Sequence, residues 1–211
     1  MGQSKTRLLN ADEEGIRAAA AALRAGALVA FPTDTVYGLG AHAFRPEAVA
    51  RIYRVKGRGE RKPIALLLAS GDDLGQVAVA ITPQAQRLAA RLWPGALTIV
   101  LPGRSEIPAV VRGGGPTVGV RVPDHPVARA LIAAAGAPLA TTSANRSGEP
   151  SPTTAAQVLE QLGGLIEFIV VGECPGGVES TVVDVSVEPP AILREGAISR
   201  AEVMAALGGP S

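Results

Sequence analysis

Hydrophobic positions along the chain follow two patterns, which predict different elements. Between Asn10 and Gly26 they recur at the spacing of one helix face, and Asn10 with Glu13 matches a capping-box variant at the start. Gly26 is the expected end of this helix. Residues 63–69 instead form an uninterrupted apolar run, which is typical of a strand covered on both faces. The chain therefore combines amphipathic helices with buried strands.

The two patterns continue along the rest of the chain. Further helices are predicted over residues 46–56, 83–92, 126–135 and 154–162, followed by a last one that Ser199 and Glu202 would cap. Strands are predicted over residues 27–31, 63–69, 96–101, 117–122, 138–142, 166–171, 181–186 and 191–194. Alternating strands and helices indicate an α/β fold, and strands that follow each other directly make its sheet mixed. No repeat or linker interrupts the pattern, so one domain is expected over residues 1–211, with its core at about 10–207.

Composition and charge exclude several classes of protein. With 47% hydrophobic and 18% charged residues the chain should fold, and a net charge of +1 gives no global signature of nucleic-acid binding. The single cysteine, Cys174, excludes an internal disulfide, and His42 and His125 are too few to favour a histidine metal site. The sequence contains neither an apolar membrane span nor a secretory signal, so a cytoplasmic location without membrane contact is expected.

Two of the loops that adjoin predicted strands are unusually polar. Residues 31–40 place two threonines, an aspartate and a tyrosine after an apolar strand, and Gly38 and Gly40 are expected to loosen this loop. A hydrogen-bonded turn is the alternative interpretation. Residues 54–62 carry five cations and one acid between a helix and a buried strand. That placement favours phosphate binding over an ordinary solvated face.

Two later segments add hydroxyl and amide groups. Residues 141–154 place Ser143, Asn145 and further hydroxyls before a predicted helix, which favours anion binding, although a capped loop is the alternative. Residues 176–181 contribute an acid and two hydroxyls, and Arg194 ends the last predicted strand. The residues available for chemistry are thus cations, hydroxyls and backbone amides.

Several familiar catalytic motifs are missing. The sequence has no P-loop, no dinucleotide-binding G-x-G-x-x-G, no H-E-x-x-H and no G-x-S-x-G elbow. A covalent protein nucleophile is therefore disfavoured. Cations and hydroxyls suit reactions that proceed by positioning and charge stabilisation, of which phosphoryl or nucleotidyl transfer is the leading class.

Seven ordered motifs resemble the YrdC/Sua5 family: FPTDTVYGLG, IYRVKGR, LWPGALTIVL, VGVRVPDHP, TTSANRSGEPSPT, GVESTVVD and ILREG. The resemblance runs from about Leu28 to Gly196. It implies a twisted α/β sheet around a deep, positively lined cavity. It also implies an L-threonylcarbamoyladenylate synthase, a nucleotidyltransferase that joins L-threonine, bicarbonate and ATP and releases pyrophosphate. The product, threonylcarbamoyl-AMP, would pass to the machinery that makes the t6A modification of tRNA.

The resemblance also assigns roles to residues. It identifies Lys56 and Arg58 as the family's catalytic K-x-R pair, and Ser143 and Asn145 as its S-x-N pair. The residues implied around L-threonine are Thr33, Thr35, Arg121, Thr141 and Ser180. The residues implied around ATP are Arg58, Lys62, Thr117, Ser143, Asn145, Ser151 and Arg194. No protein ligand to a metal is expected, and Mg²⁺ would be held mainly by the phosphates of ATP.

The chain departs from the family pattern in two respects, and two other functions are weighed beside the synthase. Longer members carry a histidine near the position of Leu67, and this chain resembles the short branch that lacks a C-terminal Sua5 domain. One alternative is a protein that binds double-stranded RNA or tRNA through the cationic segment at residues 54–62. The other is a family enzyme that makes a carbamoyl-adenylate from a different substrate.

Overall fold

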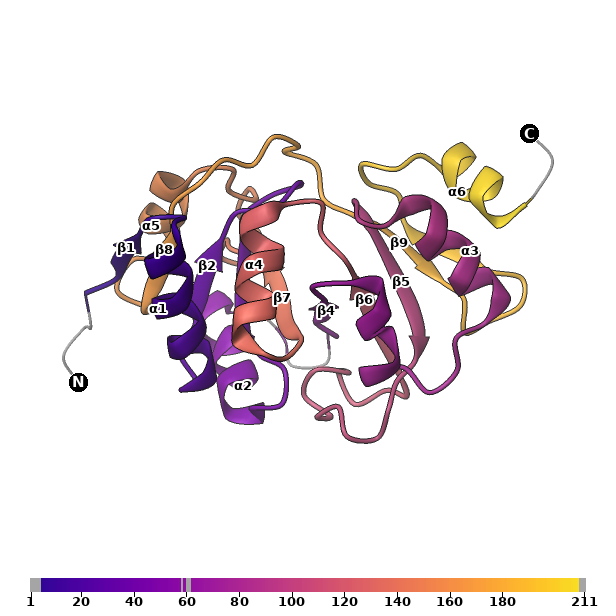
Figure 1. Cartoon of the computed structure of the whole chain (residues 1–211), viewed down its shortest axis with the longest axis horizontal. Helices are drawn as coiled ribbons and strands as arrows, with labels where there is room; N and C mark the ends of the chain where they lie inside the picture. The colour runs from indigo at the N-terminus through magenta and orange to yellow at the C-terminus, as the bar shows by residue number, and fades with distance from the viewer. Residues whose placement is uncertain (1–4, 58, 60–61, 209–211) are drawn as a thin grey trace.

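The computed structural model describes residues 5–57, 59 and 62–208, and its strands form one ten-stranded sheet (Figure 1). The strands are β1 (Arg7–Leu9), β2 (Val29–Phe31), β3 (Gly38–His42), β4 (Ala65–Leu67), β5 (Leu97–Pro102), β6 (Thr117–Arg121), β7 (Leu139–Ser143), β8 (Phe168–Val170), β9 (Thr181–Asp184) and β10 (Ala191–Arg194). Their spatial order is β1-β8-β2-β3-β7-β4-β6-β5-β9-β10. Parallel and antiparallel pairs both occur, so the prediction of a mixed sheet in an α/β fold is confirmed.

Seven helical segments accompany the sheet in the described part of the chain. They are α1 (Glu13–Arg24), α2 (Pro46–Lys56), the 3₁₀ helix η1 (Gly71–Gln76), α3 (Pro83–Leu92), α4 (Pro126–Ala135), α5 (Ala155–Leu162) and α6 (Arg200–Leu207). Three of them begin with proline, as predicted, because the first helical residue has no intrahelical partner for its N–H. Within the described ranges, no helix has the length and the hydropathy that are needed to cross a membrane.

The start of α1 differs from the prediction. Asp12, rather than Asn10, is the N-cap, and its carboxylate accepts a hydrogen bond of 2.8 Å from the backbone N–H of Gly15. Asn10 lies before the helix, and its carbonyl oxygen packs so closely on Gly15 that a Cβ there would be only 2.0 Å away. Asn and Asp are both good N-cap residues, so the spacing between Asn10 and Glu13 was not enough to identify the residue that caps the helix.

The two faces of the sheet are packed differently. On one face α1 and α4 lie side by side over β2 and β7 and bury an apolar cluster that includes Phe31, Leu67 and Leu139 (Figure 1). On the other face a larger core holds apolar residues of α2, α3, α5 and α6 against alternate strand residues such as Leu66 and Ile99. The α1–α4 layer covers only part of its face of the sheet and leaves the rest of that face uncovered.

The central strand β3 was not predicted. Gly38 and Gly40 were expected to loosen a loop, but they lie inside a strand that pairs antiparallel with both β2 and β7. A Cβ at Gly38 would lie 2.8 Å from Thr141 Cγ2, and one at Gly40 would lie 2.7 Å from Phe31 Cε1. The glycines are needed because neighbouring side chains fold over the strand, which is a tertiary requirement.

Replacing Gly40 by alanine is expected to lower the free energy of unfolding by about 1–3 kcal/mol, because the new methyl group would overlap the buried Phe31 ring. Urea unfolding measures this loss. The matched control is Gly75→Ala in η1, where nothing lies within 4 Å of the new Cβ. The control should stay within about 0.5 kcal/mol of the parent. Equal stability of the two variants would contradict this account of β3.

His42, at the end of β3, gives an expected pH dependence. Burial, with Arg45 and Arg24 nearby, lowers the pKa of His42 below its ordinary value of 6.5, and its buried Nδ1 has no partner among the described residues. Between the lowered pKa and 6.5 the unfolded chain binds more protons than the folded chain, so stability should fall as the pH drops below 6.5. Urea unfolding at several pH values tests this, and His42→Asn should reduce the dependence.

Candidate functional site

A cavity of about 490 Å³ opens on the part of the sheet that α1 and α4 leave uncovered. The register of the strands shows that the cavity and the α1–α4 layer lie on the same face of the sheet, because directly paired residues point to the same face. Leu67 pairs with Leu139 under the helices and with Arg121 in the cavity, and Ala65 pairs with Thr141. Alanine, glycine and threonine side chains are short, so these strands leave room for a ligand above them.

The cavity brings together most of the predicted site residues. Those that line it are Thr33, Thr35, Thr117, Arg121, Thr141, Ser143, Ser180 and Arg194. Three more touch the lining by hydrogen bonds, namely Lys56, Asn145 and Ser151. Lys62 is exposed beside Pro63 at the edge of the cavity, and Arg58 lies outside the described residues.

Arg121 is a buried cation at the cavity, with only 6% of its surface exposed. Its Nε donates to the carbonyl oxygen of Gly95 at 2.9 Å, Nη1 donates to Thr35 Oγ1 at 3.0 Å, and Nη2 donates to the carboxylate of Asp34. Burial lowers the pKa of Arg121, and the carboxylate of Asp34 opposes that effect. The guanidinium is therefore held at the cavity wall by groups from two separate loops.

Arg194 is the second described arginine of the cavity. Its Nη2 and Nε donate to the carbonyl oxygen of Ser180 at 2.8 and 3.1 Å, and its Nη1 donates to Glu179. The other oxygen of Glu179 accepts a hydrogen bond of 3.0 Å from Ser151 Oγ. The described lining thus contains Arg121 and Arg194 together with Glu179 and Asp184, so its formal charges balance where a positive lining was expected.

Lys56 has a position that the sequence did not predict. A lysine in a cationic loop is expected to be exposed, but Lys56 ends α2 with only 4% of its surface accessible. Its Nζ donates to the carbonyl oxygen of Ser143, to that of Asn145 at 2.6 Å and to Asn145 Oδ1 at 2.9 Å. Lys56 therefore clamps the S-x-N segment from behind, so that Ser143 can face the cavity.

Thr98 is a cavity residue that sequence analysis missed. Its hydroxyl lies 2.9 Å from Ser180 Oγ, and both residues are buried. The signal available in the sequence was Thr98 itself, the one hydroxyl residue in the apolar run of residues 96–101. Asp34 and Glu179 were noted in their loops, but their pairing with arginines distant in sequence could not be predicted.

The thiol and the phenol near the cavity stay protonated at neutral pH. Burial raises the pKa of the Cys174 thiol to about 11 and that of the Tyr37 hydroxyl to about 12. The Tyr37 hydroxyl also donates to the carbonyl oxygen of Gly172 at 2.8 Å. A protonated thiol and a buried phenol do not attack substrates, so the site is suited to binding and orienting reactants.

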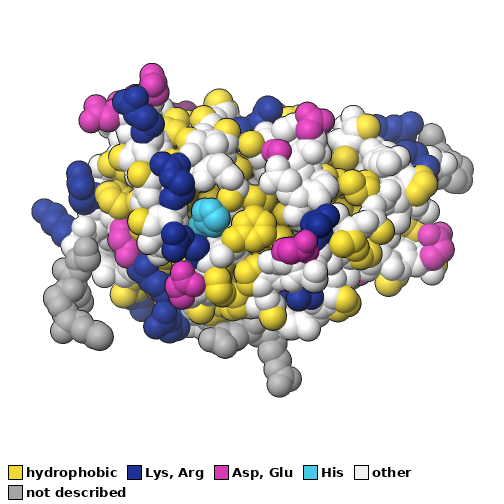
Figure 2. Space-filling model, turned by 60° about the horizontal axis from the view of Figure 1, so that its bottom comes forward, with side chains coloured by type: hydrophobic (Ala, Val, Ile, Leu, Met, Phe, Trp, Pro, Cys, Tyr) yellow, Lys and Arg dark blue, Asp and Glu magenta, His cyan; other side chains and the backbone are white. Residues whose placement is uncertain are grey.

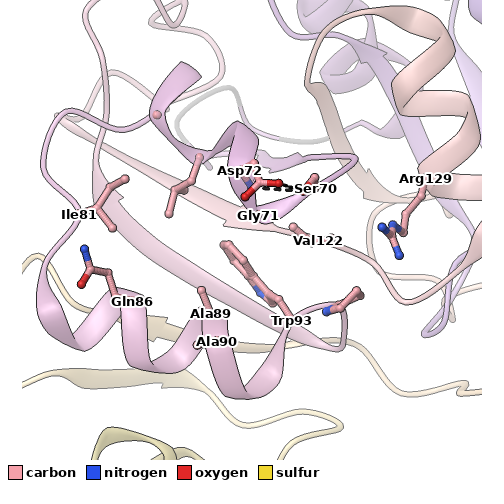
Figure 3. Close-up of a pocket in the computed structure, with 13 residues that line it drawn as sticks. Ser70, Gly71, Asp72, Ile81, Gln86, Ala89, Ala90, Trp93, Val122 and Arg129 are labelled. Carbon is pink, nitrogen blue, oxygen red and sulfur yellow. Dashed lines mark hydrogen bonds between the residues drawn. The ribbon is translucent and has the colours of Figure 1, made fainter.

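A second hollow, of about 450 Å³, lies between η1 and α3 (Figure 3). Trp93 lies in its middle, Ile81 and Gln86 are at one end, and Arg129 is at the other. Most of its lining is apolar, and it contains none of the residues predicted for catalysis or binding. The cavity on the sheet is therefore the candidate active site.

Fold and site together define an α/β protein whose sheet carries a cavity equipped with two arginines and many hydroxyls. The chain belongs to the Sua5/YciO/YrdC family, whose model, described as "Telomere recombination", matches residues 21–196. Membership of the family expected from the seven motifs is thus confirmed.

Relatives and solved structures show how far the similarity reaches. The threonylcarbamoyl-AMP synthase of Pyrococcus abyssi is 47% identical over 198 residues, which are 93% of this chain and 58% of that protein. A putative threonylcarbamoyl-AMP synthase of Mycobacterium tuberculosis is 37% identical over 195 residues, which are 92% of this chain and 89% of that protein. The structure of P. abyssi Sua5 complexed with L-threonine has a TM-score of 0.94 at 46% identity, covering 96% of this chain and 61% of that one. The chain thus spans about three fifths of the P. abyssi protein.

Proposed function

We propose that this chain is an L-threonylcarbamoyladenylate synthase, which makes threonylcarbamoyl-AMP for the t6A modification of tRNA. The observation that carries the proposal is the cavity, where two arginines from distant elements and a set of hydroxyls converge in a chain closely similar to proteins of that name. The relative complexed with L-threonine supports the amino acid as one substrate.

The reaction forms two bonds in sequence. The deprotonated amine of L-threonine first adds to CO2, which is in equilibrium with bicarbonate, and gives a carbamate. A carbamate oxygen then attacks the α-phosphorus of ATP, a new P–O bond forms, and the bond to the β-phosphate oxygen breaks to release pyrophosphate. No covalent bond to the protein is needed, which agrees with the raised pKa of Cys174.

The residues of the cavity divide between the two substrates. Arg121 would bind the carboxylate of L-threonine, with Thr33, Thr35, Thr141 and Ser180 around the rest of the amino acid. Arg194 would bind phosphate oxygens of ATP, because charge-assisted hydrogen bonds are the strongest that its side chain offers. Ser143, whose hydroxyl donates to Asn145 Oδ1 at 2.6 Å, would turn this hydroxyl to a phosphate oxygen when ATP binds. The other proposed ATP contacts are Arg58, Lys62, Thr117, Asn145 and Ser151.

Mg²⁺ fits this cavity only together with the triphosphate. The described residues contain no group of three acidic, histidine or cysteine side chains that could hold a metal. Asp184, whose Oδ1 already accepts from Ser186, is the carboxylate of the lining best able to reach an ion on the phosphates. A bound Mg²⁺ would neutralise phosphate charge, and Lys56 would keep Ser143 in place beside it.

The product of the reaction tests the proposal. Purified protein is incubated with ATP, L-threonine and bicarbonate, and mass spectrometry looks for threonylcarbamoyl-AMP while released pyrophosphate is measured. We expect both products, and neither when any one substrate is omitted. A carbamoyl-adenylate formed from another acceptor would favour a different substrate, and the absence of any ATP-dependent product would refute the synthase.

An RNA-binding protein is the weaker alternative. Figure 2 shows one face of the molecule, on which basic side chains gather toward one end with acidic and hydrophobic ones among them. The formal net charge of the whole chain is only +1. Binding driven by phosphate contacts needs a denser basic surface than this. If binding of tRNA or double-stranded RNA occurs, it would accompany the synthase activity and serve delivery of the product.

A further inference from the structure

Each described arginine of the cavity is bonded to its own carboxylate. Arg121 donates to Asp34, and Arg194 donates to Glu179. The two acidic side chains come from different loops, one after β2 and one before β9. Each carboxylate also lies near a hydroxyl of the same half of the cavity: Asp34 is next in sequence to Thr35, and Glu179 accepts from Ser151.

The Asp34 pair is built to leave part of Arg121 available to a ligand. A guanidinium has five N–H groups, and Gly95, Thr35 and Asp34 take three of them. One N–H on each terminal nitrogen has no partner among the described residues, and a carboxylate has two oxygens able to accept from such a pair. Asp34 itself does not line the cavity, so it acts on the ligand only through Arg121.

The loop that carries Asp34 is fixed from the other side. Gly177 donates its N–H to the carbonyl oxygen of Thr35 at 2.7 Å, and the absence of a side chain at Gly176 lets the backbone of Asp34 approach. Thr33 Oγ1 donates to the carbonyl oxygen of Val36 at 2.7 Å and thereby closes the turn. Asp34 is thus a rigid support for the guanidinium.

We propose that Asp34 and Glu179 are positioning residues that divide the cavity, Asp34 by holding Arg121 for the carboxylate of the amino acid and Glu179 by holding Arg194 and Ser151 for the nucleotide. This inference rests on the proposed function, which supplies the two substrates. Burial, and to a smaller extent repulsion from Arg194, lowers the pKa of Arg121, and the charge of Asp34 opposes both effects. Pairing each arginine with its own carboxylate therefore allows two cations to share one cavity. An isolated buried guanidinium would instead turn toward other acceptors.

Binding measurements on two variants test the division. Calorimetry is used to titrate L-threonine and ATP separately into wild-type protein, Asp34→Asn and Glu179→Gln. We expect Asp34→Asn to weaken L-threonine about 10-fold or more and ATP less than about twofold, and Glu179→Gln to do the reverse. L-Threoninamide, which lacks the carboxylate, should bind wild type and Asp34→Asn about equally.

The matched control is Glu167→Gln, which breaks the comparable Arg51–Glu167 pair outside the cavity lining. It should change neither affinity. If Asp34→Asn is unfolded at the assay temperature, Asp34→Glu keeps the charge but shifts it by one methylene, and it should show the same selective loss of L-threonine.

The possible results test the positioning roles separately from the proposed synthase function. Wild-type protein that binds neither substrate would overturn the proposed function and the inference with it. Wild-type binding of both substrates, with variants that weaken both alike or weaken neither, would overturn the inference alone. Selective loss of L-threonine binding in Asp34→Asn, together with selective loss of ATP binding in Glu179→Gln, would support it. Selectivity in the reverse sense would overturn it.

Discussion

Replacing Lys56 by methionine is expected to lower the free energy of unfolding by about 3 kcal/mol, because a charged donor bonded to three oxygens is lost from a buried site. For a chain of this length that is a fall in melting temperature of about 6–12 °C. Calorimetric melting measures it. The segment carrying Ser143 and Asn145 should also lose its position, so ATP affinity measured well below the melting temperature should fall as well.

The control for this prediction is Lys62→Met. Lys62 lies in the same cationic segment but is exposed, so its replacement should leave the melting temperature almost unchanged. A melting temperature unaffected by Lys56→Met would mean that the three hydrogen bonds contribute nothing. Loss of ATP binding without loss of stability would restore the direct catalytic role that the K-x-R motif implies for Lys56.

The helices could be predicted from the sequence because their signals are local. Pro46, Pro83 and Pro126 mark the first turns of α2, α3 and α4, and the pairs Thr154–Gln157 and Ser199–Glu202 form capping boxes at α5 and α6. None of these signals depends on residues far away in the chain. Strand β3 has no such signal. Its glycines are required because the side chains of Phe31 and Thr141 pack against the strand and leave no room for a Cβ.

The candidate site was partly predictable for a related reason. The motifs identified the hydroxyls and cations that line the cavity, since these lie on loops whose sequence is distinctive. The motifs could not predict which of these side chains form ion pairs. Arg121 and Asp34, for example, are 87 residues apart in the sequence. For the same reason the burial of Lys56 was missed, because its three acceptors lie on residues that follow it by 87 or 89 positions.

Valine is expected to be a far poorer substrate than serine, although it is closer to threonine in shape. The cavity contains many hydroxyls, among them Thr33, Thr35, Thr98, Thr141 and Ser180, and some of these should bond the hydroxyl of the substrate. These hydroxyls already bond one another or the backbone but keep free acceptor sites, and valine has no hydroxyl to donate to them. The kcat/KM of valine should therefore fall roughly 10³-fold or more below that of threonine. Serine keeps the hydroxyl and loses one methyl, which should cost only about 10–200-fold. Pyrophosphate release with each amino acid, with bicarbonate and ATP held constant, gives the three values. A valine rate equal to that of serine would mean that the cavity selects its amino acid by shape, and that its hydroxyls serve the nucleotide or the fold instead.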